Sequence, residues 1–347
     1  MTTTSDAPAT PEARSRQAFL GSLIADAVAM PVHWYYNQQA IDRDYPELVA
    51  GGRYLAPKNP HVDSILWRSS YTAANEKGDI LHDQARYWGQ RGIHYHQFLS
   101  AGENTLNFQL AAELYEFVRA RRDYDPEQWL DRYVAFMLTP GRHRDTYVEE
   151  YHRHFFTNLA AGRKPINCGV RDVHIGGLVP VPALVVALGP KHPDLRRIVR
   201  LHVGLTHKDD EVLEAADILT RILARVCNGD DLRETILEEA SGWISAAKVG
   251  AWERQPDHVV VGSILSSACY IPDAFPAALY LAWRHAGDFA AGVCANAQVG
   301  GDSCHRGAVV GSLLGATAAI PDRFVAGLQA RDRVEGLFPR RTEDTPA

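Results

Sequence analysis

The sequence lacks paired cysteines and long apolar runs. Its five cysteines are scattered and form no CxxC motif: Cys168, Cys227, Cys269, Cys294 and Cys304. An odd, scattered set argues against a disulfide scaffold and favours a reduced compartment. No apolar run opens the chain, and no apolar stretch is long and uninterrupted enough to span a bilayer. We therefore expect a cytoplasmic protein with no membrane partner.

An excess of positive charge is also missing. The 347 residues carry 36 Lys and Arg against 42 Asp and Glu, for a formal net charge of −6. This balance gives no electrostatic footprint for nucleic acid. The hydrophobic content of 46% with 22% charged residues is typical of a soluble globular protein. The expected partner is a small molecule, and composition leaves the oligomeric state open.

Strand signals are few, and no Pro/Gly/Ser-rich linker or charge block divides the chain. Apolar residues recur at helical spacing, which predicts an all-α fold with one domain over residues 15–334. The polar segments 1–14 and 335–347 are expected to be a disordered N-terminal tail and a frayed C-terminal tail. Glycine at every fourth position from 307 to 315 predicts a smooth helix face that a second helix can approach closely. Helices are predicted over residues 16–29, 105–121, 126–138, 144–161, 182–188, 194–205, 209–226, 232–247, 274–283 and 288–297.

A long loop-rich insertion separates the first helices. Residues 51–102 show no long periodic segment and are rich in Gly, Pro, Asn, Asp, His and aromatic residues. Such a connection inside a compact domain is usually functional. His94 and His96 lie two apart in an extended segment and would point to the same side, as two ligands would. The alternative is a pair of loop histidines hydrogen-bonded to the backbone.

Two polar residues stand out near the first helix. Asp26 lies among apolar helix positions, where an unpartnered carboxylate would be costly, so we expect a hydrogen-bond hub or, alternatively, a site residue. His33 follows the helix end at Pro31 and is well placed to face a cleft. A further segment, 167–177, is expected near the cleft, where Arg171, Asp172 and His174 can bind phosphate or sugar hydroxyls. The alternative is an internal Arg–Asp pair.

The stretch 296–316, NAQVGGDSCHRGAVVGSLLGA, combines a tight turn with a helix start. Gly300 and Gly301 allow positive φ and close backbone approach. Asp302 follows at the position of a helix N-cap. Cys304 and His305 then fall in the first helical turn, where the dipole favours anions and can lower the pKa of a thiol. The density of acid, thiol, imidazole and guanidinium favours a site over a plain capped core helix.

Three segments together resemble the ADP-ribosylglycohydrolase family in order and spacing: GSLIADAVAMPVHWYY, GLTHKDDEVLEAADIL and NAQVGGDSCHRGAVVGSLLGATA. The resemblance implies an all-helical fold and, in the family's enzymes, two magnesium or manganese ions that orient an ADP-ribosyl group for hydrolysis. It implies that the ligand positions converge on one pocket.

The metal ligands that the resemblance implies are largely replaced in this chain. The family's Thr-Asp-Asp triplet falls on Thr105-Leu106-Asn107, its Asp-x-Asp-Thr group begins at Asp302 and places His305 last, and its glutamate becomes His33. Only Thr105 and Asp302 match. Hard divalent cations need anionic oxygen ligands, so we expect no binuclear magnesium or manganese site and leave any other cofactor open.

Three functions remain. The first is a hydrolase of a ribosyl N- or O-glycosidic bond, with Asp302 as base or electrostatic stabiliser. Its substrate, ADP-ribosyl or nucleoside-like, would be bound by His33, Thr105, Asn107, His305, His94, His96, Gly300 and Gly301. The second is an enzyme that uses Cys304 as nucleophile, or one softer metal held by histidines and Cys304. The third is an inactive nucleotide- or sugar-binding protein. We favour the hydrolase, because the replacing residues are themselves chemically capable.

Overall fold

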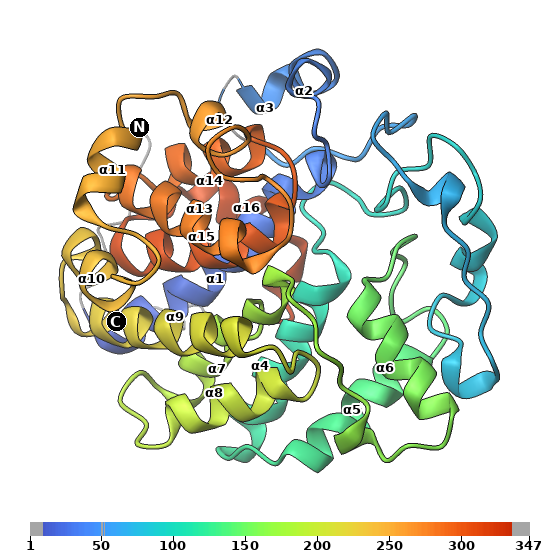
Figure 1. Ribbon diagram of the computed structural model, residues 1–347. Coiled ribbons are helices and arrows are strands. Elements are labelled where there is room, and N and C mark those ends of the chain that lie inside the picture. The colour runs from blue at the N-terminus through green and yellow to red at the C-terminus, as the bar shows by residue number, and fades with distance from the viewer. Residues whose placement is uncertain (1–9, 50, 52, 335–347) are drawn as a thin grey trace, which may run out of the picture.

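The computed structural model describes residues 10–49, 51 and 53–334, and within these ranges the chain is helical with three isolated β-bridges and no strands. The predicted all-α fold is thereby confirmed. No helix in these ranges has both the length and the apolar character needed to cross a membrane. Figure 1 shows the main helices, which are α1 Pro11–Ala29, α4 Leu106–Arg121, α5 Pro126–Leu138, α6 Glu150–Ala160, α7 Val181–Leu188, α8 Leu195–Gly204, α9 Asp210–Asn228, α10 Leu232–Glu239, α11 Ala246–Trp252, α13 Ile271–Arg284, α14 Phe289–Gln298 and α15 Ser303–Thr317.

Helix α1 begins earlier than predicted. The Thr10 side chain accepts a hydrogen bond from the backbone N–H of Ala13, and Pro11 stands at the first helical position. Both features favour a helix start. Residues 11–14, which we expected in a disordered tail, are therefore helical. The remaining tail predictions fall on residues 1–9 and 335–347, which lie outside the described residues.

Helices α1 and α15 pack against each other at the centre of the molecule (Figure 1). The close approach depends on glycine. A Cβ added at Gly311 would lie 2.3 Å from the carbonyl oxygen of Gly21, and one at Gly315 would lie 2.3 Å from that of Gln17. Neither distance is tolerated by real carbon atoms. The smooth face predicted from the glycine spacing is confirmed, and it holds the start of α15 beside the end of α1.

Two predicted helices differ from the structure. The helix predicted from residue 144 begins only at Glu150, because residues 144–149 form an irregular segment in which Asp145 bonds to other parts of the chain. The helix predicted over 232–247 is broken into α10 and α11. Ser245 caps the second of these by accepting from the N–H of Lys248. Short helices that the periodicity did not indicate are α2 Gln38–Asp44, α3 Pro46–Val49, α12 Asp257–Val260 and α16 Asp322–Gly327.

The loop-rich insertion is present as predicted. Residues 53–102 contain no α-helix and only three short 3-10 turns, η2 Leu66–Arg68, η3 Glu76–Gly78 and η4 His82–Tyr87. Figure 1 shows this segment beside α6, and η3 packs against both α5 and α6. His94 and His96 of the insertion lie beside the segment that follows α1, in contact with Pro31 and His33.

Candidate functional site

A glycine turn just before α15 is hydrogen-bonded to the segment that follows α1. Gly300 and Gly301 have φ of 65° and 63°, in the left-handed region that glycine adopts without strain. The N–H of Trp34 donates to the carbonyl of Gly301 (2.7 Å), and the N–H of Gly301 donates to the carbonyl of Tyr35 (2.6 Å). These bonds set His33 beside Asp302, although 269 positions separate them. Gly300 and Gly301 therefore build the site through their backbone.

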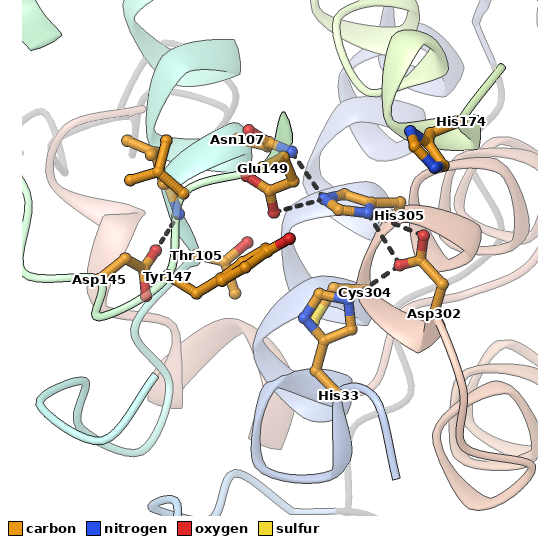
Figure 2. Close-up of polar contacts among 12 residues, drawn as sticks. His33, Thr105, Asn107, Asp145, Tyr147, Glu149, His174, Asp302, Cys304 and His305 are labelled. Carbon is orange, nitrogen blue, oxygen red and sulfur yellow. Dashed lines mark hydrogen bonds and ion pairs between the residues drawn. The ribbon is translucent and has the colours of Figure 1, made fainter. Parts of the chain in front are cut away.

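Five polar side chains form a continuous buried chain of contacts, which we call the carboxylate–imidazole chain. Asp145 Oδ1 lies 2.6 Å from His96 Nδ1, and His96 Nε2 lies 2.7 Å from His33 Nδ1. His33 Nε2 lies 2.8 Å from Asp302 Oδ1, which in turn lies 2.8 Å from His305 Nδ1. All five side chains are at most 3% exposed. Figure 2 shows the part of the chain around His33, Asp302 and His305.

Asp302 differs from its predicted role as a helix cap. It occupies the N-cap position of α15, but its side chain makes no capping hydrogen bond. The carboxylate instead contacts His33 and His305. Burial opposes its ionisation, yet the charge and hydrogen bond of His305 and the hydrogen bond of His33 hold the pKa of Asp302 well below its usual range. The ionised carboxylate of Asp302 is therefore buried at the N-terminus of α15.

His305 lies between two carboxylates. Its Nε2 is 3.4 Å from Glu149 Oε1 and 2.6 Å from the Asn107 side-chain amide. Burial opposes protonation, but Asp302 and Glu149 raise the pKa of His305 well above its usual value. In return, although burial opposes it, the hydrogen bond and charge of His305 lower the pKa of Glu149 to about 2. The second oxygen of Glu149, Oε2, has no hydrogen-bond partner among the described residues.

Asp302, His305 and Glu149 open onto a pocket of about 440 Å³. Its lining includes six Trp and Tyr side chains and the carboxylates of Asp63, Glu149, Glu150 and Asp302. Such a pocket, apolar with a few convergent polar groups, is typical of a small-molecule site. Figure 2 shows Tyr147, Glu149 and His174 around His305. The residues that complete the lining are Trp34, Tyr36, Asp63, Ile65, Arg68, Tyr95, Tyr147, Glu150, Tyr151, His174, Gly176, Ala268, Cys269 and Tyr270.

His174 supplies a positive charge to this pocket. Its Nδ1 lies 2.7 Å from Asp172 Oδ1. Burial lowers its pKa, but the hydrogen bonds to Asp172 and Cys269 outweigh that effect and raise the pKa to about 11. The sequence indicated that the segment 167–177 lies near a cleft, and His174 does line the pocket. Asp172 does not line the pocket itself but orients the His174 ring through this contact.

Several predicted site residues lie behind the pocket. Thr105 donates its hydroxyl and its backbone N–H to Asp26, so Asp26 is the hydrogen-bond hub we expected. Asn107 accepts from Tyr151 and His152 through Oδ1 and contacts the pocket through Tyr151 and His305. His94 bonds to the carbonyl of Pro31 and accepts from the N–H of His96. These backbone contacts match the alternative expected for a loop histidine.

The prediction for Cys304 is wrong in one respect. Its thiol is fully buried and donates to the carbonyl oxygen of Asp26 at 3.7 Å. Burial, together with the charge and hydrogen bond of Asp26, raises the pKa of Cys304 well above its usual value. The position in the first turn of α15 therefore does not activate the thiol, because desolvation outweighs the helix dipole.

Sequence reasoning missed two carboxylates. Glu149 was placed inside a predicted helix, whereas it is the last residue before α6. Asp145 was not singled out, although it bonds to His96 and also accepts from the N–H of Leu106 at the start of α4 (2.5 Å). The only signal for either was a charged residue within a predicted helix, and many positions in the chain share it.

A family model described as ADP-ribosylglycohydrolase matches residues 7–345, nearly the whole chain. The chain belongs to the ADP-ribosylglycohydrolase family. No curated protein matches the sequence. Among solved structures, a chain titled ADP-ribosylglycohydrolase-related protein complex is similar, with a TM-score of 0.61 and 23% identity, over 94% of this chain and 96% of that one. At that identity the likeness establishes the shared fold.

The metal pair implied by the ADP-ribosylglycohydrolase resemblance does not fit the residues present. Two hard cations need several anionic oxygens directed at them. Thr105 is bound to Asp26, and Asn107 is engaged by Tyr151 and His152. Asp302 is enclosed by two imidazoles. The donor set is therefore nitrogen-rich, and we assign no step of the reaction to a magnesium or manganese pair.

Proposed function

We propose that this member of the family hydrolyses a ribosyl N- or O-glycosidic bond in the pocket lined by Asp302, His305 and Glu149. The observation that supports this most is the pair of carboxylates held on opposite ring nitrogens of one buried histidine. Hydrolysis of a glycosidic bond passes through an oxocarbenium-like state with positive charge on the sugar ring. Asp302 and Glu149, with the charged His305 between them, carry a net negative charge in a largely desolvated wall, and this net charge stabilises the cationic sugar.

Glu149 is the residue we assign to proton transfer. Its Oε2 has no hydrogen-bond partner among the described residues, and the carboxylate lines the pocket. A water molecule that attacks the anomeric carbon gives its proton to the Glu149 carboxylate as the glycosidic bond breaks. The same proton is then available to the leaving group, which departs with the bonding electrons. Asp302, buried and ionised, remains an electrostatic stabiliser throughout.

Two cations at the wall can bind a phosphate of the substrate, although the carboxylates of Asp63, Glu149, Glu150 and Asp302 line the same pocket. His174 is protonated at neutral pH, since its pKa is raised to about 11, and Arg68 lines the same pocket. The aromatic rings of Tyr36 and Tyr270, each 54% exposed, offer flat surfaces for a base or sugar. An ADP-ribosyl or related nucleotide substrate satisfies both features.

The test is a screen of ribosyl substrates with two point variants. ADP-ribosylated side chains, ADP-ribose esters and free nucleosides are incubated with the protein, with metals supplied and with chelator. We expect cleavage of at least one class. Glu149→Gln and Asp302→Asn should each lower kcat by roughly two or more orders of magnitude, as loss of acid–base or electrostatic help does. Ligand affinity should change much less.

Glu116→Gln is the matched control, because Glu116 pairs with Arg132 and Arg333 and does not line the pocket. It should leave kcat unchanged. If no class of bond is cleaved while a nucleotide binds equally well to the parent protein, Glu149→Gln and Asp302→Asn, the protein is a nucleotide-binding member without hydrolase activity.

A further inference from the structure

The pocket wall contains a cysteine that the proposed hydrolysis does not use. Cys269 is partly exposed and lines the pocket together with His174. The N–H of Ile175 donates to the carbonyl of Cys269 at 2.8 Å, and His174 pairs with Tyr270 in an isolated antiparallel bridge. The backbone therefore holds these two segments, which are distant in the sequence, side by side at the pocket.

The side chains of Cys269, His174 and Asp172 form a connected set, which we call the thiol triad. The His174 ring is hydrogen-bonded to the Cys269 side chain, and its Nδ1 lies 2.7 Å from Asp172 Oδ1. Asp172 is 5% exposed and also accepts from the backbone N–H of His174 at 2.9 Å. The carboxylate thus fixes the orientation of the ring. A nucleophile beside an imidazole that a third group orients is the arrangement that activates thiols for covalent chemistry.

Positive charge on His174 favours a nucleophilic sulfur. Burial lowers the pKa of His174, but its hydrogen bonds to Asp172 and Cys269 outweigh burial and raise the pKa to about 11. The ring is therefore a cation at neutral pH. A cation next to a thiol favours the thiolate, which is the form that attacks electrophiles. The carboxylates that line the same pocket oppose a further anion, whereas His174 contacts the sulfur directly.

The other four cysteines are in less reactive surroundings. Cys168, Cys227 and Cys304 are buried, and Cys294 is partly exposed. Burial raises the pKa of all four, to about 12 for Cys227 and to about 11 for Cys294, which keeps these thiols protonated at neutral pH. None of them lines the pocket. A thiol reagent should therefore distinguish Cys269 from the rest.

We propose that Cys269 is a reactive thiol of the pocket, activated by His174 and Asp172, and that hydrogen peroxide converts it to a sulfenic acid. The thiolate sulfur attacks one oxygen of the peroxide, so that an S–O bond forms and the O–O bond breaks. The leaving hydroxide takes the proton of His174 and departs as water. The sulfur is oxidised and the peroxide is reduced. A small thiol restores the cysteine, because a sulfenic acid condenses with thiols.

Modification at Cys269 would change the pocket itself. The thiol shares the pocket of about 440 Å³ with Asp302 and His305, so an added oxygen atom takes up space beside the proposed ribosyl site. Oxidation also removes the anionic sulfur that His174 contacts. A loss of turnover after oxidation rests on the proposed function, whereas the modification itself does not.

The test measures the rate of modification at each cysteine. The full reduced chain is treated with iodoacetamide at neutral pH, where the thiolate displaces iodide and forms a carbon–sulfur bond. Peptide mass spectrometry gives the alkylation rate of each cysteine. We expect Cys269 to react at least about tenfold faster than Cys294, the other partly exposed thiol. With hydrogen peroxide and dimedone, a reagent that traps sulfenic acids, the label should appear first at Cys269.

Two variants test the role of the imidazole. His174→Gln should slow the alkylation of Cys269 by about tenfold, because a neutral amide does not stabilise a thiolate. His285→Gln is the matched control, since His285 also pairs with a carboxylate, that of Asp257 at 2.9 Å, but does not line the pocket. In this control Cys269 should react at the parent rate.

The rates in the parent protein decide the matter even if a variant fails to fold, and an absence of hydrolase activity changes none of them. Faster alkylation at any other cysteine, no sulfenic label at Cys269, or an unchanged Cys269 rate in folded His174→Gln overturns the proposal.

Discussion

Cys304 and His305 are neighbours in the chain, but the structure places them in opposite surroundings. His305 is flanked by the carboxylates of Asp302 and Glu149, which favour its charged form. Cys304 is packed against the backbone of Asp26 in a dry part of the core, which disfavours its charged form. At the residue scale, the chemistry depends on which face of the first turn of α15 each side chain occupies.

Cys304→Ala tests whether the buried thiol takes no part in the reaction. The change removes one buried sulfur atom and its weak hydrogen bond to Asp26. We expect the free energy of unfolding to fall by about 1–2 kcal/mol, in the range of small core truncations, while turnover stays near the parent value. Chemical denaturation and a turnover assay measure the two effects. A folded variant without turnover would restore Cys304 as a nucleophile.

At the scale of elements, the site depends on how closely α15 approaches α1. Gly307, Gly311 and Gly315 face α1, and carbonyl oxygens of Gly21 and Gln17 occupy the space where larger side chains would stand. This contact fixes how closely α15 lies to α1, and it thereby places Asp302 next to His33. The N-terminal end of α6 acts in the same way, because the residue before it is Glu149.

Gly311→Ala should destabilise the fold. The new Cβ would lie 2.3 Å from the carbonyl oxygen of Gly21, so one helix must shift. We expect a loss of about 2 kcal/mol in the free energy of unfolding, within the range measured for overpacking.

Gly250→Ala is the opposite control. Gly250 lies inside α11 with nothing within 4 Å of an added Cβ. Alanine should therefore raise the free energy of unfolding by about 0.5–1 kcal/mol, through its higher helix propensity. Urea denaturation of both variants checks the two signs. Equal effects at the two sites would contradict the close-approach argument.

At the scale of the whole molecule, a buried acid ties the end of the described chain to α4. Glu113 is 3% exposed and pairs with Arg132, Arg142 and Arg333. Burial raises its pKa, but Arg333, Arg132 and Arg142 outweigh burial and hold the pKa below the ordinary value of 4.5. The network joins α4, α5 and the segment after α16, which are distant in the sequence.

This network predicts a pH dependence of stability. Because the pKa of Glu113 is lower in the folded state than in the unfolded state, its contribution is present above about pH 5 and is lost as the pH falls through the lowered value. Glu113→Gln should cost about 2 kcal/mol at pH 7, the loss expected for hydrogen bonds to a charged group, and less at pH 3. Denaturant unfolding at both pH values measures the difference.

Glu238→Gln serves as the comparison, because Glu238 is 61% exposed and pairs with Arg225. An exposed pair of this kind contributes little, so we expect a change within about 0.5 kcal/mol at either pH. A Glu113→Gln effect that is equally small, or that grows toward acid pH, would contradict the assignment.

The sequence by itself determined the helical fold and part of the site. Apolar residues at helical spacing predicted α4, α5, α7, α8, α9 and α14 to within a few residues, because burial of one helix face is a local property of the sequence. The glycine spacing of α15 and the turn before it predicted a close helix pair. Asp302 and His305 could be singled out because their helix start is visible in the sequence.

Tertiary structure alone decided which polar groups meet. His96 and Asp145 join the carboxylate–imidazole chain, and Glu149 contacts its last member His305, through segments that are irregular in the structure. Such segments carry no local signal of where they pack. Burial decided the chemistry as well. The same desolvation that keeps the Cys304 thiol protonated and the His33 ring neutral is overcome at Asp302 and His305 only because opposite charges lie within hydrogen-bonding distance. A linear sequence specifies neither burial nor those distances, so the protonation states of the site follow from the fold.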